Sequence, residues 1–554
     1  MESHPATTLK MKARIRPRVG LACMAGAILL LYGPFALASA ACSAPPAMKA
    51  RIQARPTAEA YAGLGGWFGD RRQFVCAAEA YAHAFKLQPH SSAYAYMWGL
   101  SLSSGGQFQK AVDPLQQATR LNPSDIRPHL VLAAALDRMK NTAEGEAEWR
   151  AALAIDPESA VALDSLSQHF LDRKDYSSVI ALLDKPGKER LRTPAQSLNL
   201  GVAYAGRVEL DKAYNVLREG LNNNPDSLPL ANELAVVLML LGRDQEAYAV
   251  FDLALARHPG DQPTQILYLH TLVSSSSEKA PELGRKLLAA YPDQWEVLYL
   301  VGVLESREAD FEHARAHLER SVALNPGYYQ AHDELGSILA KQGDLPGARE
   351  HLEKAIALGD NQPEVQYDLA KVLQRLGDTA QAQEKLRIYQ QLKKARSETT
   401  QAAGKAEVGD QAMATGDPAK AASLYKEALE NDPDEPLLYY KLSKALDKLK
   451  DLAGEKAALQ RAIQLNPSLA EAQNQMGYLA ARDGDLAPAE GYFRAAVGAS
   501  PSYTGAWINL AATLASEEKW QDARQAVGRA LEIDPDNAEA RELGQALAAA
   551  HAGP

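Results

Sequence analysis

A proline recurs about every 34 residues along most of this sequence, each time at the end of an apolar stretch rich in Leu and Ala. A fixed period of this length is the signature of a solenoid, in which each repeat packs mainly against its neighbours. Because proline cannot continue a helix, each closing proline marks the end of a helical unit. The closing prolines are Pro89, Pro123, Pro157, Pro225, Pro259, Pro292, Pro326, Pro433, Pro467, Pro501 and Pro535.

The two longer intervals fit the same register. The interval of 68 residues holds two units, with Leu191 in the missing closing position. The interval of 107 residues that ends at Pro433 holds three units and five extra residues, with Asp360 and Lys394 in the first two closing positions. The register therefore predicts about fourteen units between residue 56 and Pro535.

With the five extra residues before unit 11 allowed for, a small residue stands ten residues after the closing position in thirteen of the fourteen units, Leu269 being the exception. Two antiparallel helices approach closely only where their crossing point carries almost no side chain. We therefore expect a helix-turn-helix unit that crosses at this position. The small residues are Gly65, Gly99, Ala133, Ser167, Gly201, Ala235, Gly302, Gly336, Ala370, Gly409, Ser443, Gly477 and Ala511.

These residues resemble the tetratricopeptide repeat, whose pattern pairs a Leu-Gly step with a later Tyr, then Ala, Phe and Pro. The best matches are Leu200, Gly201 and Tyr204 in one unit and Ala489 and Phe493 before the closing proline of another. The resemblance covers about nine-tenths of the chain. It implies an all-α protein, an α-solenoid forming a right-handed superhelix of about fourteen repeats with a concave inner surface.

Several units depart from the pattern. The fourth loses its second helix after Leu183, and the seventh is one residue short near Ser274–Ser277. Residues 386–410 lack a helix breaker before Gly404, which predicts a long helix or helical joint that could act as a hinge. Four Gly-Asp pairs end the first helix of their units, where glycine is expected as a left-handed cap. These glycines are Gly343, Gly377, Gly416 and Gly484.

The first forty residues have the pattern of an export signal. Basic residues 10–18 precede an apolar stretch, and Ala38–Ala40 fits a signal-peptidase site, so we expect cleavage after Ala40. Two alternatives stay open: an uncleaved membrane anchor, and an outer-membrane lipoprotein acylated on Cys42, although the residues before that cysteine fit a lipobox poorly. The predicted organisation is a signal peptide at 1–40, a flexible lead-in at 41–55, a repeat array at 56–394, an insert at 395–399, a second array at 400–535, and a capping helix with a tail at 536–554.

Charge and cysteine content exclude several functional classes. The chain has 59 basic and 69 acidic residues, a net charge of −10, and removal of the leader makes it more acidic. Such a chain lacks the basic footprint that attracts a phosphate backbone, so nucleic acid is not an expected partner. The three cysteines predict neither a disulfide framework nor a thiolate metal site, and Cys76 is interpreted as a small buried hydrophobe.

No phosphate-binding loop, nucleophile elbow or zinc-peptidase motif occurs, and the sequence predicts no catalytic residues, no cofactor and no enzyme activity. One weak metal candidate is a stripe of histidines, because His313 and His317 lie four residues apart and His351 follows at the equivalent position of the next unit. We interpret these three as exposed side chains.

The resemblance places the binding groove on the first helix of each unit. Aromatic and polar residues recur there at positions that share a helix face, and rings provide contact area at low entropic cost. Tyrosine is also tolerated at this position for packing alone, so both interpretations stay open. The candidate partner-binding residues are Tyr96, Tyr299, Tyr367, Lys371, Tyr440, Lys444, Asp447, Asn474 and Tyr478.

Export, repeats and the absence of catalytic motifs together predict a non-catalytic protein–protein interaction scaffold in a bacterial cell envelope or periplasm. Extended protein or peptide partners would lie in the groove. An alternative is an accessory protein of polysaccharide export or biosynthesis that guides a glycan, and a third is a repeat subunit associated with an enzyme. Membrane contact is expected only through an uncleaved N-terminal anchor.

Overall fold

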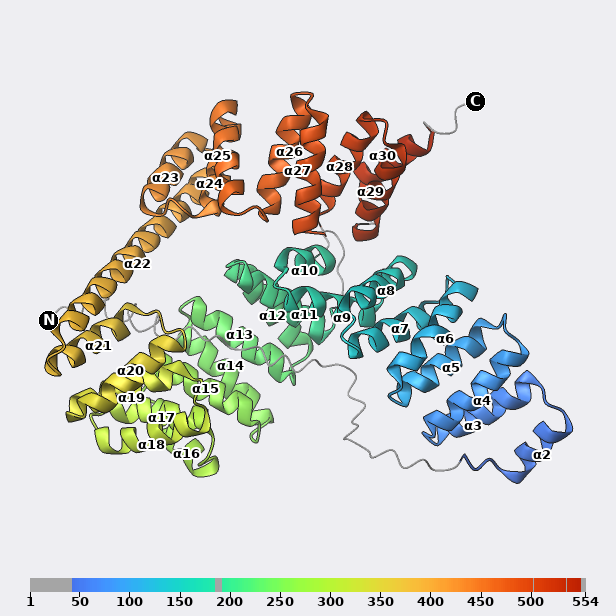
Figure 1. The fold of residues 1–554 in the computed structure, drawn as a ribbon, viewed down its shortest axis with the longest axis horizontal. Helices are drawn as coiled ribbons and strands as arrows, with labels where there is room; N and C mark the ends of the chain where they lie inside the picture. The colour runs from blue at the N-terminus through green and yellow to red at the C-terminus, as the bar shows by residue number, and fades with distance from the viewer. Residues whose placement is uncertain (1–41, 185–191, 502, 535, 550–554) are drawn as a thin grey trace. The chain divides into compact units, whose positions relative to one another are not determined.

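The computed structural model describes residues 42–184, 192–501, 503–534 and 536–549, and these form helices α2–α30 without a strand (Figure 1). The expectation of an all-α solenoid is confirmed. No described helix combines the length and apolarity that crossing a membrane requires. The predicted leader, the closing positions Leu191 and Pro535, and the truncating segment after Asp184 lie outside the described residues.

The helices alternate as first and second helices of the predicted units. The first helices are α3 (Ala58–Asp70), α5 (Ser92–Ser104), α7 (Ile126–Arg138), α9 (Ala160–Asp172), α11 (Pro194–Gly206), α13 (Leu228–Leu240), α15 (Gln262–Ser274), α17 (Trp295–Arg307), α19 (Tyr329–Gln342), α21 (Pro363–Arg375), α24 (Pro436–Lys448), α26 (Ala470–Arg482) and α28 (Thr504–Ser516). The second helices are α4 (Phe74–Leu87), α6 (Phe108–Leu121), α8 (Thr142–Ile155), α10 (Tyr176–Leu183), α12 (Leu210–Asn223), α14 (Asp244–Arg257), α16 (Ala280–Ala290), α18 (Phe311–Leu324), α20 (Leu345–Ala357), α23 (Pro418–Asn431), α25 (Leu452–Leu465), α27 (Leu486–Ala499) and α29 (Trp520–Ile533). Three helices stand outside this alternation: α2 (Pro46–Ala54), α22 (Thr379–Ala414) and α30 (Ala538–Ala549).

The small residues lie where the two helices of a unit cross, as predicted. A Cβ atom added to Gly336 would stand 2.7 Å from Cγ of Leu352, and one added to Gly201 would stand 2.4 Å from Cγ of Leu217. Both distances are shorter than carbon atoms tolerate, so a larger residue would force the helices apart.

The turn inside each unit adopts the left-handed conformation. The predicted glycine caps are confirmed, since Gly343 and Gly484 have φ of +90° and +86°. Other units place a side chain at the equivalent position, including Lys140 and Val208 with φ of +61° and +64°. The sequence pattern did not predict these non-glycine turns, because L-residues disfavour positive φ.

By contacts the described chain divides into two compact parts. One is Pro225–Ala499, and the other consists of the described residues of 42–224 and 500–549. The predicted division into arrays 56–394 and 400–535 stays a prediction.

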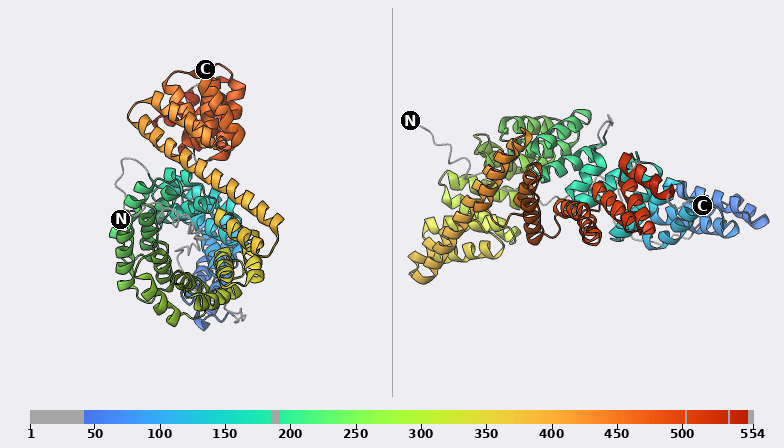
Figure 2. Two further views of the ribbon diagram at one scale, coloured as in Figure 1. Left: turned by 90° about the vertical axis from the view of Figure 1, so that its left-hand side faces the viewer. Right: turned by 90° about the horizontal axis from the view of Figure 1, so that it is seen from above.

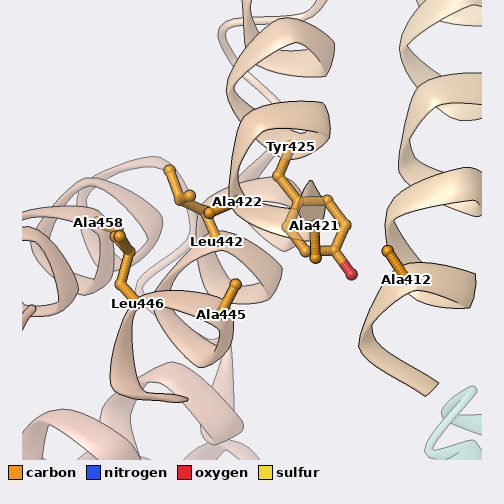
Figure 3. Close-up of a cluster of buried hydrophobic side chains, with 8 residues drawn as sticks. All are labelled: Ala412, Ala421, Ala422, Tyr425, Leu442, Ala445, Leu446 and Ala458. Carbon is orange, nitrogen blue, oxygen red and sulfur yellow. The ribbon is translucent and has the colours of Figure 1, made fainter. Parts of the chain in front are cut away.

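Helix α22 departs most from the repeat. It joins the second helix of unit 10 to the first helix of unit 11 without a turn, and Figure 2 shows it unbroken from two directions. The sequence predicted a long helix or joint here, and the structure has a helix. Residues 383–401 of α22 contribute no buried side chain. The next core cluster begins at Ala402, which packs with Ala428 and Leu438. In the cluster that follows, Ala412 lies beside the ring of Tyr425 (Figure 3).

The N-terminal end corrects two expectations. Cys42 and Cys76, one repeat length apart, form a disulfide with their Cα atoms 5.5 Å apart, so Cys76 is not a free buried thiol. The segment predicted as a flexible lead-in contains helix α2, and Ala44 packs with Phe68 in the first core cluster. A cysteine count too low for a framework still allows a single bridge between the lead-in and the first unit.

Candidate binding groove

The nine candidate residues all lie on first helices, as the resemblance implied. Tyr96 is on α5 and Tyr299 on α17, whereas Tyr367 and Lys371 share α21. The remaining five residues lie on two successive first helices. These are Tyr440, Lys444 and Asp447 on α24, and Asn474 and Tyr478 on α26.

Tyr299 belongs to the core rather than to an open groove. Its side chain is 8% exposed, and Tyr328 from the next unit meets its ring edge to face, with centroids 5.0 Å apart. Burial raises the pKa of the Tyr299 hydroxyl well above its ordinary value. Such an enclosed ring stabilises the array but offers little surface to a partner.

Tyr96 is half-buried and carries a cation. The guanidinium of Arg127, from the next unit, lies 5.3 Å from the ring centroid and also binds the carboxylate of Asp125. Burial raises the pKa of the Tyr96 hydroxyl. This ring is therefore largely occupied by contacts inside the chain.

Tyr367 and Lys371 form an open aromatic–cation pair on unit 10. Tyr367 is 38% exposed, and Lys371 Nζ lies 4.2 Å from the centre of its ring. Lys371 also donates to Asp368 over 3.3 Å. Tyr389 of α22 lies beside Tyr367 with ring centroids 5.0 Å apart. The two rings and the lysine make a surface that can hold an aromatic or acidic side chain.

A second open surface spans units 12 and 13. Tyr440 packs at the edge of a core cluster that includes Met476, and Lys444 Nζ lies 5.8 Å from the Tyr440 ring centre. On the following first helix, Tyr478 is 51% exposed, the largest exposure among the aromatic residues in the described parts of the chain. Asn474 stands one turn before it. These positions confirm that the side chains lie on successive helices, while their role in binding stays a prediction.

A buried carboxyl lies close to this surface. Glu455 on α25 is 0% exposed, and Gln475 donates to one of its oxygens over 2.9 Å. Burial, together with the nearby charge of Asp447, raises the pKa of Glu455. The sequence does not indicate that Glu455 is buried, because a glutamate on an amphipathic helix ordinarily lies in solvent.

Units 6 and 7 contain two further titratable groups that the prediction did not include. Glu233 and His270 keep part of their surface open, yet the surrounding protein excludes much of the bulk water. This raises the pKa of Glu233 to about 7 and lowers that of His270 to about 4, because burial disfavours the charged form. Nearby, Asn232 donates to Thr264 over 2.9 Å and links successive first helices.

The structure does not bring the weak metal candidate together. His313 contacts Asp310 and His317 contacts Glu305, each at 2.8 Å, whereas His351 pairs with His332 at 2.9 Å between the Nδ1 atoms. No group of three or more His, Cys, Asp or Glu able to hold a metal occurs among the residues described. His351 occupies the same repeat position as His317 but lies one unit further along, on α20. The shared repeat position therefore does not bring the two imidazoles together.

Comparison with known families agrees with the repeat register. A model described as TPR repeat matches residues 336–377. A model described as Tetratricopeptide repeat matches 96–160, 409–470, 456–504 and 474–538. No curated protein sequence matches the chain.

Solved structures with a similar arrangement of helices include a hetero-tetramer of the APC/C, Cut9–Hcn1, and yeast Tom70. Both are 15% identical to this chain. The first aligns over 90% of this chain and 92% of its own length with a TM-score of 0.35. The second aligns over 89% and 96% with a TM-score of 0.29.

Proposed function

Because the chain is a tetratricopeptide repeat protein, a fold that typically serves as a non-catalytic scaffold for protein partners, we propose that it binds extended protein segments on units 10, 12 and 13. The observation that carries this proposal is the exposure of tyrosine and lysine side chains on three first helices, α21, α24 and α26. Lys371 covers Tyr367 and Lys444 approaches Tyr440, while Tyr478 is 51% exposed. Rings this exposed contribute little to the core and lower solubility. Binding a partner is a reason for their presence at the surface.

The chemistry of the surface favours a peptide with aromatic or acidic side chains. A ring inserted beside Tyr367 or Tyr478 buries apolar area, and a carboxylate would find Lys371 or Lys444 within reach. The face of Tyr367 is already polarised by a cation, which favours a further planar group on its open side. An extended segment fits better than a globular surface, because the candidate side chains repeat from unit to unit.

Photocrosslinking tests the proposal. A photoreactive phenylalanine analogue at position 367 or 478 should link reproducible protein partners in cells that make the chain. Trp520 provides a matched control, since it is an aromatic residue that is 37% exposed but lies on a second helix outside the candidate surface. The proposal fails if positions 367 and 478 link nothing, or if position 520 links the same partners.

We further propose that the chain is exported and works in the periplasm or cell envelope. The disulfide between Cys42 and Cys76 supports this, because such bonds persist in oxidising compartments and are rare in the cytosol. The same bond argues against acylation of Cys42, since one sulfur cannot serve both. After cell fractionation the chain should lie in the periplasmic or envelope fraction, with both cysteines resistant to alkylation until a reductant is added. A chain found only in the cytosol, with both cysteines free, would contradict the proposal.

A further inference from the structure

Within the parts of the chain that the structure describes, the junction between units 10 and 11 leaves two complementary helix faces without a partner. At ordinary junctions, the residue five before the closing position packs against the residue five after it. Ala428 shares a core cluster with Leu438, and Ala462 shares one with Ala472. At the junction of units 10 and 11, the equivalent residues are Tyr389 and Gly404. They lie fifteen residues apart on one straight helix, about 22 Å, and cannot meet within the chain.

The leading face of unit 11 is open at positions that other units bury. Val408, nine residues into its unit, is 44% exposed, and nothing lies within 4 Å of a Cβ added to Gly404. Residues at the position of Val408 are buried in every other unit from the third onward: Leu132, Leu166, Leu200, Leu234, Tyr268, Val301, Leu335, Leu369, Leu442, Met476 and Leu510.

The trailing face of unit 10 is open in the same way. Leu386 is only partly buried, whereas its equivalents Leu352 and Leu459 are fully buried. Tyr389 occupies a position that holds buried alanine in most units, such as Ala355 and Ala428. A large residue here would collide with an ordinary neighbouring unit, but the facing position of unit 11 is Gly404, the smallest residue possible. The two faces are therefore matched in size.

The charges of α22 are also matched. Its first half, Thr379–Arg396, has five basic residues and one acidic residue, while its second half, Ser397–Ala414, has one basic and three acidic residues. An antiparallel pair of α22 helices would place each basic half beside an acidic half. A parallel pair would set like charges side by side.

From these faces we propose that a second copy of this chain covers the junction. Unit 10 of one copy stacks on unit 11 of the other, Tyr389 of each copy lies over Gly404 of its partner, and the two α22 helices run antiparallel about an axis midway between these positions. The interface is the ordinary junction between repeats, exchanged between chains. It includes two equal contacts, because the same surface of each copy is used twice.

Sedimentation of the full chain tests the proposal. The wild type should have the mass of two chains, and Val408→Lys should weaken association at least about tenfold, because it places an unpaired charge in the interface. Val161→Lys is a matched control, since Val161 is 42% exposed on α9 in the other compact part. A monomeric wild type at tens of micromolar, or equal weakening by both variants, would overturn the proposal. Unchanged helicity and thermal midpoint would confirm that Val408→Lys still folds.

Cysteine crosslinking tests the register. A mixture of one chain carrying Tyr389→Cys and another carrying Gly404→Cys should form a disulfide-linked pair, while neither chain alone should do so beyond the native-cysteine background. A single chain carrying both substitutions should link between copies. A bond formed within one chain would instead show that α22 breaks and unit 11 folds back on unit 10, which contradicts the proposal.

Discussion

Tyr299 in unit 8 and Tyr367 in unit 10 hold the same residue type at the same position of the repeat, but their surroundings differ. Tyr299 is 8% exposed because Tyr328 of the following unit covers its ring. Tyr367 is 38% exposed, and the ring beside it, Tyr389, comes from its own unit. The repeat position thus fixes where a side chain sits on its helix. The residues that pack against the side chain decide whether it belongs to the core or to a binding surface.

Truncation of the tyrosines should separate these two roles most clearly. Tyr299→Ala should lower the free energy of unfolding by about 3 to 5 kcal/mol, because it removes a buried ring from a packed core. Tyr478→Ala, at a position 51% exposed, should cost less than about 1 kcal/mol. Denaturant unfolding followed by circular dichroism measures both. Similar losses for the two variants would contradict the assignment of Tyr299 to the core.

The next largest difference in stability is expected between Leu352 and Leu386, which occupy the same position on the second helices of units 9 and 10. Leu352→Ala in unit 9 should lower the free energy of unfolding by about 2 to 5 kcal/mol, since Leu352 is 0% exposed. Leu386→Ala, the equivalent change in unit 10, should cost roughly 1 kcal/mol or less in a monomeric background such as Val408→Lys. If the two substitutions cost the same there, an ordinary unit must stack on unit 10 after all.

A smaller effect concerns the ionisation of Glu233 in unit 6. The pKa of Glu233 rises from 4.5 in the unfolded chain to about 7 in the folded one, so folding favours its protonated form. Stability should therefore fall as pH rises from about 4.5 to 7, and Glu233→Gln should remove this loss. We expect the variant to be more stable than wild type by about 1 to 2 kcal/mol at pH 8 and equal to it at pH 4. This figure is smaller than the full pKa shift would give, because the Glu233 side chain is partly exposed to solvent.

The exposed lysines of units 10 and 12 should behave differently from Glu233. Lys371 and Lys444 are exposed, so Lys371→Ala and Lys444→Ala should change stability by less than about 0.5 kcal/mol at any pH between 5 and 8. Unfolding curves collected over this range give both results. A pH-dependent loss in the lysine variants would place them in a dehydrated environment that the structure does not show.

The fold was predictable because its cause is local and repeated. Gly336 and Gly201 indicate a close helix crossing from the sequence alone. In the structure, a Cβ at either position would clash with a leucine of the second helix. The burial of Tyr299 was not predictable, since it depends on Tyr328 of another unit rather than on the repeat position. The left-handed turn at Val208 was also missed, because the array imposes a conformation that valine alone disfavours.

The candidate surface was predictable only in part. The register placed Tyr367, Lys371 and Tyr478 on first helices, but Tyr389, which completes the aromatic pair, comes from a stretch where the repeat pattern fails. The disulfide was missed because Cys42 lies outside the repeats, where periodicity gives no information about distance. The repeat pattern therefore predicts positions within the units but not the contacts at their junctions.

The distance across α22 within one chain tests the account most directly. Spin labels at the exposed positions 383 and 407 are separated by twenty-four residues, which is about 36 Å along a continuous helix. Dilution with excess unlabelled chain restricts the measurement to labels on the same molecule. If α22 is continuous, the distances should form a narrow distribution near that value. A main population at roughly 10 to 15 Å, the spacing of helices packed side by side, would show that unit 11 covers unit 10 and would contradict a continuous α22.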